Sequence, residues 1–220
     1  MIWFPLGIFA LLIILGLTFI PASKRDSGFI FSCAIALLAS FLVSFLYSFI
    51  KNSFPLTDDF NRILVHYMVH DHLFFYYPGV FTVLVCMLCI RKDFSLRSAQ
   101  AASLVLFSFY MFLAMLASYF YSSHGGWADP YFLFFLTGSR VLQCVVFAFT
   151  APLLFIKPFH VWKILPALFI LLVFPFTTVP VSYLYYTSRI SQAVQILAIL
   201  YGAALLIILP LLIFFRRDKA

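Results

Sequence analysis

Arg140 is the residue whose position in the sequence most clearly calls for a chemical explanation. It lies nine residues after the start of an apolar segment that covers 131–156. At 1.5 Å of rise per helical residue, it would lie about 14 Å below a membrane surface, close to the middle. An arginine at that depth costs about 2.5 kcal/mol or more unless it finds a partner. None of the apolar segments contains Asp or Glu, so we expect the partner to be a backbone carbonyl, water, a lipid phosphate or a bound anion.

Polar side chains at a similar depth are expected to complete a pocket around Arg140. Two threonines lie about 13 Å from the outer end of the apolar segment 164–186, between Pro175 and Pro180, and each proline frees the carbonyl four residues earlier. A glutamine follows Arg140 by one turn, and two more lie at the outer end of the last segment. The candidate ligand-binding residues are Arg140, Gln143, Thr177, Thr178, Gln192 and Gln195. They predict an outward-facing pocket for an anionic substrate or a lipid headgroup. The alternative is that Arg140 binds the freed carbonyls and only holds two helices together.

The polar run at 66–72 is the second candidate. Histidines at positions i and i+4 share one face of a helix, which is a spacing that can bind zinc or another divalent metal ion. The candidate metal ligands are His66, His70, Asp71 and His72, with His124 as a further donor. The run lacks the glutamate that acts as a general base in HExxH motifs. The alternative is that the connection 51–71 holds a short amphipathic helix in the membrane interface, with the histidines on its polar side.

The composition defines the class of protein that must position these residues. Of the 220 residues, 65% are hydrophobic and only 10% are charged, and the mean hydropathy is +1.10. A soluble domain is about 45–50% apolar and about 25% charged. These values exclude a soluble enzyme or a nucleic-acid-binding module, in spite of the net charge of +7. They predict a polytopic membrane protein with membrane lipids as its first partners.

Seven apolar segments are long enough to cross a membrane as helices. They cover about 1–20, 29–50, 72–90, 98–121, 131–156, 164–186 and 191–215. Their apolar residues do not alternate with polar ones, as the strands of a membrane barrel would require. The predicted fold is therefore an all-α transmembrane bundle of seven spans, forming a single integral membrane domain over 1–220.

The basic residues predict the orientation of this bundle. Cytoplasmic connections carry an excess of Lys and Arg. With the N-terminus outside, ten basic residues fall on the cytoplasmic side and three on the outer side. The inner residues are Lys24, Arg25, Arg91, Lys92, Arg97, Lys157, Lys163, Arg216, Arg217 and Lys219, and the outer ones are Lys51, Arg62 and Arg189. We therefore expect an outer N-terminus and a cytoplasmic C-terminus, in a cell membrane of bacterial inner-membrane type.

The sequence favours a transporter, or a transporter-like membrane subunit, over an enzyme. It contains no Walker motif, no GxSxG motif and no paired catalytic carboxylates. Because the apolar segments lack carboxylates, proton-driven transport is disfavoured. Two alternatives stay open: a membrane enzyme with a metal site on the outer His/Asp face, and a structural subunit that binds other membrane subunits.

Overall fold

The computed structural model describes residues 3–21, 25, 27–50, 52–54, 59–90, 95–121, 137–155 and 161–217, which are almost entirely helical and contain no strand. The α-helices are α1 (Trp3–Thr18), α2 (Ser27–Ile50), α3 (Phe60–Tyr67), α4 (Tyr77–Ile90), α5 (Leu96–Tyr121), α6 (Thr137–Thr150), α7 (Val161–Val173), α8 (Thr178–Tyr186) and α9 (Ile190–Arg217). Between them lie the π-helix η2 (Met68–Tyr76) and the 3-10 helices η6 (Ala151–Leu154) and η7 (Phe174–Thr177).

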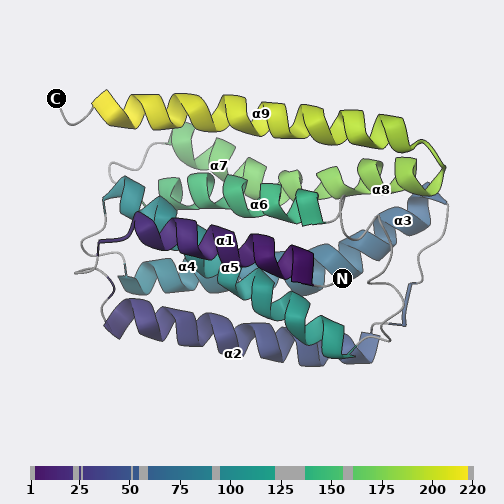
Figure 1. Cartoon of the computed structure of the whole chain (residues 1–220), viewed down its shortest axis with the longest axis horizontal. Helices are drawn as coiled ribbons and strands as arrows, with labels where there is room; N and C mark the ends of the chain where they lie inside the picture. The colour runs from purple at the N-terminus through teal and green to yellow at the C-terminus, as the bar shows by residue number, and fades with distance from the viewer. Residues whose placement is uncertain are drawn as a thin grey trace.

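The helices form a bundle of long rods that run alternately in opposite directions (Figure 1). One rod is formed by the consecutive helices α3, η2 and α4. A second rod is formed by the consecutive helices α7, η7 and α8. In Figure 1, α9 lies along one side of the bundle, where it packs on α6 and α8. α5 packs against α1, α2, α4 and α6, so it is the central helix.

Among the described residues, four helices are long and apolar enough to cross a membrane: Ser27–Ile50, Phe60–Ile90, Leu96–Ala117 and Thr137–Leu154. The predicted all-helical architecture is therefore confirmed, and the helices suit a membrane protein. The count of seven spans and the orientation stay predictions. The predicted start of the fifth segment falls within 122–136, outside the described residues.

The rod that contains the polar run begins earlier than the sequence suggested. It is continuous over 31 residues, Phe60–Ile90, whereas the prediction was a span from residue 72 preceded by a separate interfacial helix. The short amphipathic helix predicted within 51–71 is present as α3, but it continues into η2 and α4, so the helix does not begin at residue 72. The boundary was misplaced because the polar residues of the run were assigned to a connection. Several of them are instead buried inside the bundle, so the chain does not need to leave the apolar interior there.

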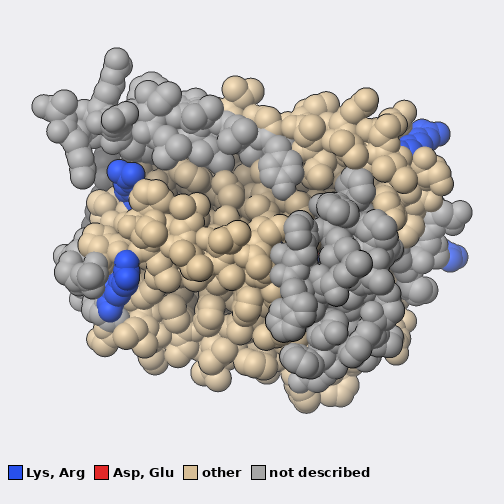
Figure 2. Space-filling view, in the orientation of Figure 1, with Lys and Arg blue, Asp and Glu red and all other residues tan. Residues whose placement is uncertain are grey.

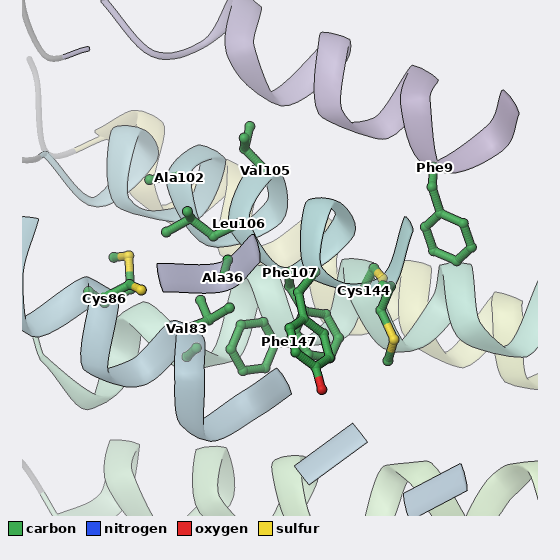
Figure 3. Close-up of a cluster of buried hydrophobic side chains, with 14 of the residues drawn as sticks. Phe9, Ala36, Val83, Cys86, Ala102, Val105, Leu106, Phe107, Cys144 and Phe147 are labelled. Atoms are coloured by element: carbon green, nitrogen blue, oxygen red, sulfur yellow. The ribbon is translucent and has the colours of Figure 1, made fainter. Parts of the chain in front are cut away.

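Aromatic rings and small residues fill the interior around α5. Phe107 and Phe147 stack with ring centroids 4.3 Å apart, and both are fully buried (Figure 3). A Cβ atom on Gly79 would lie 2.7 Å from two ring carbons of Tyr110. Only a glycine therefore allows α4 to approach α5 so closely at this point.

A stripe of small residues faces the interior from α2. Its members recur every four residues, and Ala36, Ser40 and Ser44 are all 0% exposed. The serines Ser32 and Ser40 bond carbonyls of their own helix, which satisfies their hydroxyls without a neighbour. The stripe lets α2 pack closely on α4 and α5.

The surface has an apolar middle and basic ends. On the face in Figure 2, the Lys and Arg side chains of the described residues lie near the ends of the helices, and uncharged side chains cover the middle. Large apolar side chains are exposed along α2, such as Phe49 at 72% and Leu38 at 69%. At the end of α1, the Arg25 guanidinium donates to the carbonyls of Leu17 at 2.6 Å and Ile20 at 3.0 Å. This surface is suited to contact with lipid.

Candidate ligand-binding site

The candidate site is built on η2, where three consecutive polar residues are buried. His70, Asp71 and His72 are each at most 4% exposed. π-Helical turns are rare, and they occur frequently at functional sites. This one lies inside the long rod Phe60–Ile90. The irregular backbone therefore brings ionisable side chains into the interior of a candidate membrane helix.

Asp71 forms a buried ion pair with Arg140 of α6. Its Oδ1 lies 2.5 Å from the Nη2 atom of Arg140, and the two residues are 4% and 8% exposed. The Arg140 guanidinium also lies 5.7 Å from the centroid of the Phe75 ring, within range of a cation–π contact. The prediction that no carboxylate is available to Arg140 is therefore wrong. It failed because residue 71 was assigned to an outer connection, although it belongs to the rod.

His72 links this ion pair to the break between α7 and α8. Its Nε2 lies 3.0 Å from the carbonyl oxygen of Pro175 and 3.4 Å from the hydroxyl of Thr178. Because a carbonyl only accepts, Nε2 carries the proton in that bond. The same nitrogen lies 3.9 Å from Oδ2 of Asp71. The two irregular segments, η2 and η7, therefore meet at His72.

The broken helix lies where the prolines predicted it, but its carbonyls have partners other than Arg140. The 3-10 helix η7 contains Pro175 and interrupts the helical hydrogen bonds. His72 bonds the carbonyl of Pro175, and the hydroxyl of Tyr77 donates to the carbonyl of Leu172 at 2.9 Å. These carbonyls are not those of Leu171 and Phe176, which the two prolines were expected to free, and Arg140 bonds Asp71 instead.

Several polar atoms around the ion pair are buried without a hydrogen-bond partner among the described residues. They are Oδ2 of Asp71, Nε of Arg140, both amide atoms of Gln143, Nδ1 of His72 and the hydroxyl of Tyr110. Gln143 is only 1% exposed and lies one turn after Arg140 on the same face of α6. Each unpaired buried group costs about 1–3 kcal/mol. The cluster can therefore accept hydrogen bonds from, and donate them to, a polar molecule.

The predicted ligand-binding residues do not all lie in this cluster. Arg140 and Gln143 are buried in α6, and Thr178 is buried against His72. The half-buried Thr177 bonds the carbonyl of Phe174 in its own turn at 2.7 Å. The structure places two of the set elsewhere, because Gln192 and Gln195 are exposed at the start of α9.

Sequence reasoning missed Asp71, His72 and Tyr110 as neighbours of Arg140. The signal that would have found the first two is the apolar stripe of α3, which includes the buried Ile63 and Tyr67. Extended through residue 72, that stripe gives one long helix with a polar run in its interior. Tyr110 carried no signal, because a tyrosine in an apolar segment is ordinary.

The predicted metal ligands divide between two places. The rings of His66 and His70 lie 4.4 Å apart, and each bonds a backbone carbonyl of the segment 52–54. Asp71 and His72 belong instead to the interior cluster. Within the described part of the chain, no three His, Cys, Asp or Glu side chains come together as metal ligands. His124 lies outside the described residues, and the zinc site stays a prediction.

A separate hollow of about 280 Å³ opens at the surface of α3. It is lined by Phe54, Asn61, Arg62 and Val65, and none of these belongs to the Arg140 cluster. The outward-facing pocket around Arg140 also stays a prediction.

No protein-family model, curated protein or solved structure matches this chain. The function is therefore argued from the geometry of the cluster itself.

Proposed function

We propose that this chain is a multi-pass integral membrane protein of the transporter type, whose interior cluster around Arg140 and Asp71 binds a small polar ligand. The observation that carries the proposal is the set of buried polar atoms without partners around the ion pair. Ionisable residues inside membrane helices are rare and mark pathways for substrates and ions. Burying them together with unpaired amide atoms only to join two helices would destabilise the bundle for no gain.

The two irregular segments support transport rather than a purely structural role. In many transporters, substrates bind near the middle of the membrane, where helices are interrupted. Such irregular backbone is tolerated only where protein or a wet cavity supplies hydrogen-bond partners. Here η2 and η7 meet through the bond from His72 to the carbonyl of Pro175. The residue before His72 is Asp71, which forms the ion pair with Arg140.

The proposed topology has seven spans, with the N-terminus outside and the C-terminus in the cytoplasm. In Figure 1 the rods alternate in direction, and the first helix, α1, runs the same way as the last, α9, which supports an odd number of crossings. The excess of basic residues at the connections on one side supports the orientation. In this topology, the rod Phe60–Ile90 enters from the outer side, and α6 begins on that side too.

The ion pair changes one argument about mechanism. Proton-driven transport was disfavoured because no apolar segment contained a carboxylate, but Asp71 lies inside a candidate membrane helix. That objection is removed. The small-residue stripe of α2 gives no support to the alternative role as a structural subunit, because Ala36, Ser40 and Ser44 are buried within this chain.

Ligand binding to the purified full chain tests the proposal. The chain is reconstituted in lipid nanodiscs, and its thermal unfolding is recorded with a panel of small polar molecules at constant ionic strength. At least one of them is expected to raise the melting temperature of the wild type and of Arg189→Gln, a variant of an exposed arginine. The same molecule is expected to leave Gln143→Leu unchanged, because that variant lacks the unpartnered amide.

The proposal is overturned if every effective molecule stabilises Gln143→Leu as much as the wild type. It is also overturned if no molecule in the panel stabilises the wild type. Circular dichroism and gel filtration establish that each variant is folded and monodisperse before it is compared.

A further inference from the structure

We infer that the ligand of this cluster is electrically neutral and presents a hydrogen-bond donor beside an acceptor, as a carboxamide or a protonated carboxylic acid does. This inference rests on the proposed function and specifies its ligand. It departs from the anionic ligand that the sequence predicted, because Arg140 already has a carboxylate as its partner.

The first argument is the charge of the cluster. The carboxylate of Asp71 and the guanidinium of Arg140 cancel one another at 2.5 Å. Gln143, Thr178 and Tyr110 add no charge, and His72 donates from Nε2 to a carbonyl, as a neutral imidazole can. An anion brought into this interior would face Asp71 without a counter-charge of its own, and a cation would face Arg140 in the same way. Burying an unpaired charge in a medium of low dielectric constant is strongly unfavourable.

The second argument is the pattern of unpartnered atoms. Arg140 offers one donor at Nε, and Asp71 offers one acceptor at Oδ2. The amide of Gln143 adds an NH2 group that donates and a carbonyl oxygen that accepts. With the proton of His72 on Nε2, its unpartnered Nδ1 is a further acceptor, and the Tyr110 hydroxyl can donate or accept. A ligand that only accepts would leave the acceptor atoms of the cluster unpaired, and a ligand that only donates would leave the donors of Arg140 and Gln143 unpaired. A group with a donor beside an acceptor can satisfy atoms of both kinds.

The neighbouring ionisable groups leave this balance intact. Two ionisable side chains interact electrostatically with Asp71: Tyr47 of α2 and His66 of α3. Tyr110 of α5 interacts electrostatically with Arg140. His66 bonds the carbonyl of Phe54 at 2.8 Å, which does not require a charged ring. Among the described residues packed around the cluster, Asp71 and Arg140 are thus the pair whose charges decide which ligand is accepted.

Three probes of nearly identical size and shape test the inference. Acetate is an anion, acetamide is neutral, and acetamidinium is a cation. Binding to the full chain in nanodiscs is measured by thermal stabilisation and by calorimetry at pH 7. The wild type is expected to bind acetamide at least about tenfold more tightly than either ion, since about 1.4 kcal/mol corresponds to a factor of ten. The variant Gln143→Leu reports any general solvent effect of acetamide.

Substitutions that change the charge of the cluster should change the preferred probe. Asp71→Asn leaves a net positive cluster, which is expected to prefer acetate. Arg140→Gln leaves a net negative cluster, which is expected to prefer acetamidinium. The double variant Asp71→Asn with Arg140→Gln is neutral again and should return to acetamide, and it provides a folded reference if either single variant unfolds. Asp59→Asn, at the exposed start of α3, should behave as the wild type.

The outcomes separate this inference from the proposed function. If the wild type prefers acetate, and Arg140→Gln abolishes that binding, then the cluster binds a ligand but the neutral class is wrong. If both single variants keep the probe preference of the wild type, although their clusters are charged, the charge argument is wrong. If none of the three probes binds the wild type more than Gln143→Leu, the neutral class is overturned. If, in addition, no molecule of the wider panel of small polar molecules stabilises the wild type more than Gln143→Leu, the proposed function is overturned too.

Discussion

The ion pair between Asp71 and Arg140 is held where neither residue could lie alone. Each carries a full charge at less than a tenth of its maximal exposure, so each supplies the partner that makes burial of the other tolerable. Gln143 is different, because both ends of its amide lack a partner among the described residues. The two charges therefore serve stability and binding together, whereas the amide serves binding alone.

This difference predicts how Gln143→Leu behaves without ligand. Replacing an unpaired buried amide by an apolar group of similar size removes a cost of about 1–3 kcal/mol. The free energy of unfolding should therefore stay the same or rise, although ligand binding is lost. Reversible unfolding in mixed detergent micelles measures it, with Gln192→Leu on the exposed start of α9 as the matched control, expected within about 0.5 kcal/mol of the wild type. A loss of more than about 1 kcal/mol in Gln143→Leu would mean that the amide has a structural partner.

At the scale of the elements, the approach of α4 to α5 depends on one glycine. The ring of Tyr110 lies over Gly79, and the Tyr110 hydroxyl belongs to the candidate site. The contact between these helices therefore sets the position of a tyrosine that interacts electrostatically with Arg140. The rods themselves follow from uninterrupted apolar segments, and η7 follows from Pro175, which it contains, and from Pro180 in the first turn of α8.

A methyl group at this contact should separate the two helices. In Gly79→Ala, the new Cβ would lie 2.7 Å from ring carbons of Tyr110 and 3.0 Å from Phe107, so these rings must move. We expect a loss of about 1–3 kcal/mol in the free energy of unfolding. In the control Gly202→Ala, the new Cβ has no neighbour within 4 Å, and helix propensity predicts a gain of about 0.5–1 kcal/mol. Equal thermal stabilities of the two variants would contradict this account of the packing.

Much of the bundle could be predicted from the sequence, but the site could be predicted only in part. Arg140 stood out because a charge in an apolar segment requires an explanation, and the break near Pro175 followed from proline geometry. The partner of Arg140 could not be found in the same way. Polar residues in a run, such as His70 to His72, normally mark the end of a span, and only their burial and the ion pair of Asp71 with Arg140 reveal that they are interior. Gln192 and Gln195 were placed in the pocket because they lie at the outer end of the last apolar segment, but both are exposed in the structure.

At the scale of the whole molecule, the account requires that successive rods cross a membrane. Reporter fusions in a bacterial host check this arrangement. Alkaline phosphatase is active only outside the inner membrane, so fusions after Ser53 and after Arg189 should be active, and a fusion after Arg25 should be inactive. A fluorescent protein fused after Ala220 should fluoresce in the cytoplasm. The reverse pattern would invert the orientation, and activity at both Arg25 and Ser53 would show that α2 does not cross.

The most direct measurement of the central claim is a double-mutant cycle on the ion pair, with the free energy of unfolding recorded for the wild type, Asp71→Asn, Arg140→Gln and the double variant. Removing one partner leaves the other charge buried and unpaired, so Arg140→Gln and Asp71→Asn should each lose about 3–5 kcal/mol. The double variant should lose clearly less than the sum of the two, with a coupling of about 1–3 kcal/mol. If the loss in the double variant equals the sum of the two single losses to within about 0.5 kcal/mol, the two residues do not interact, and the site built on them does not exist.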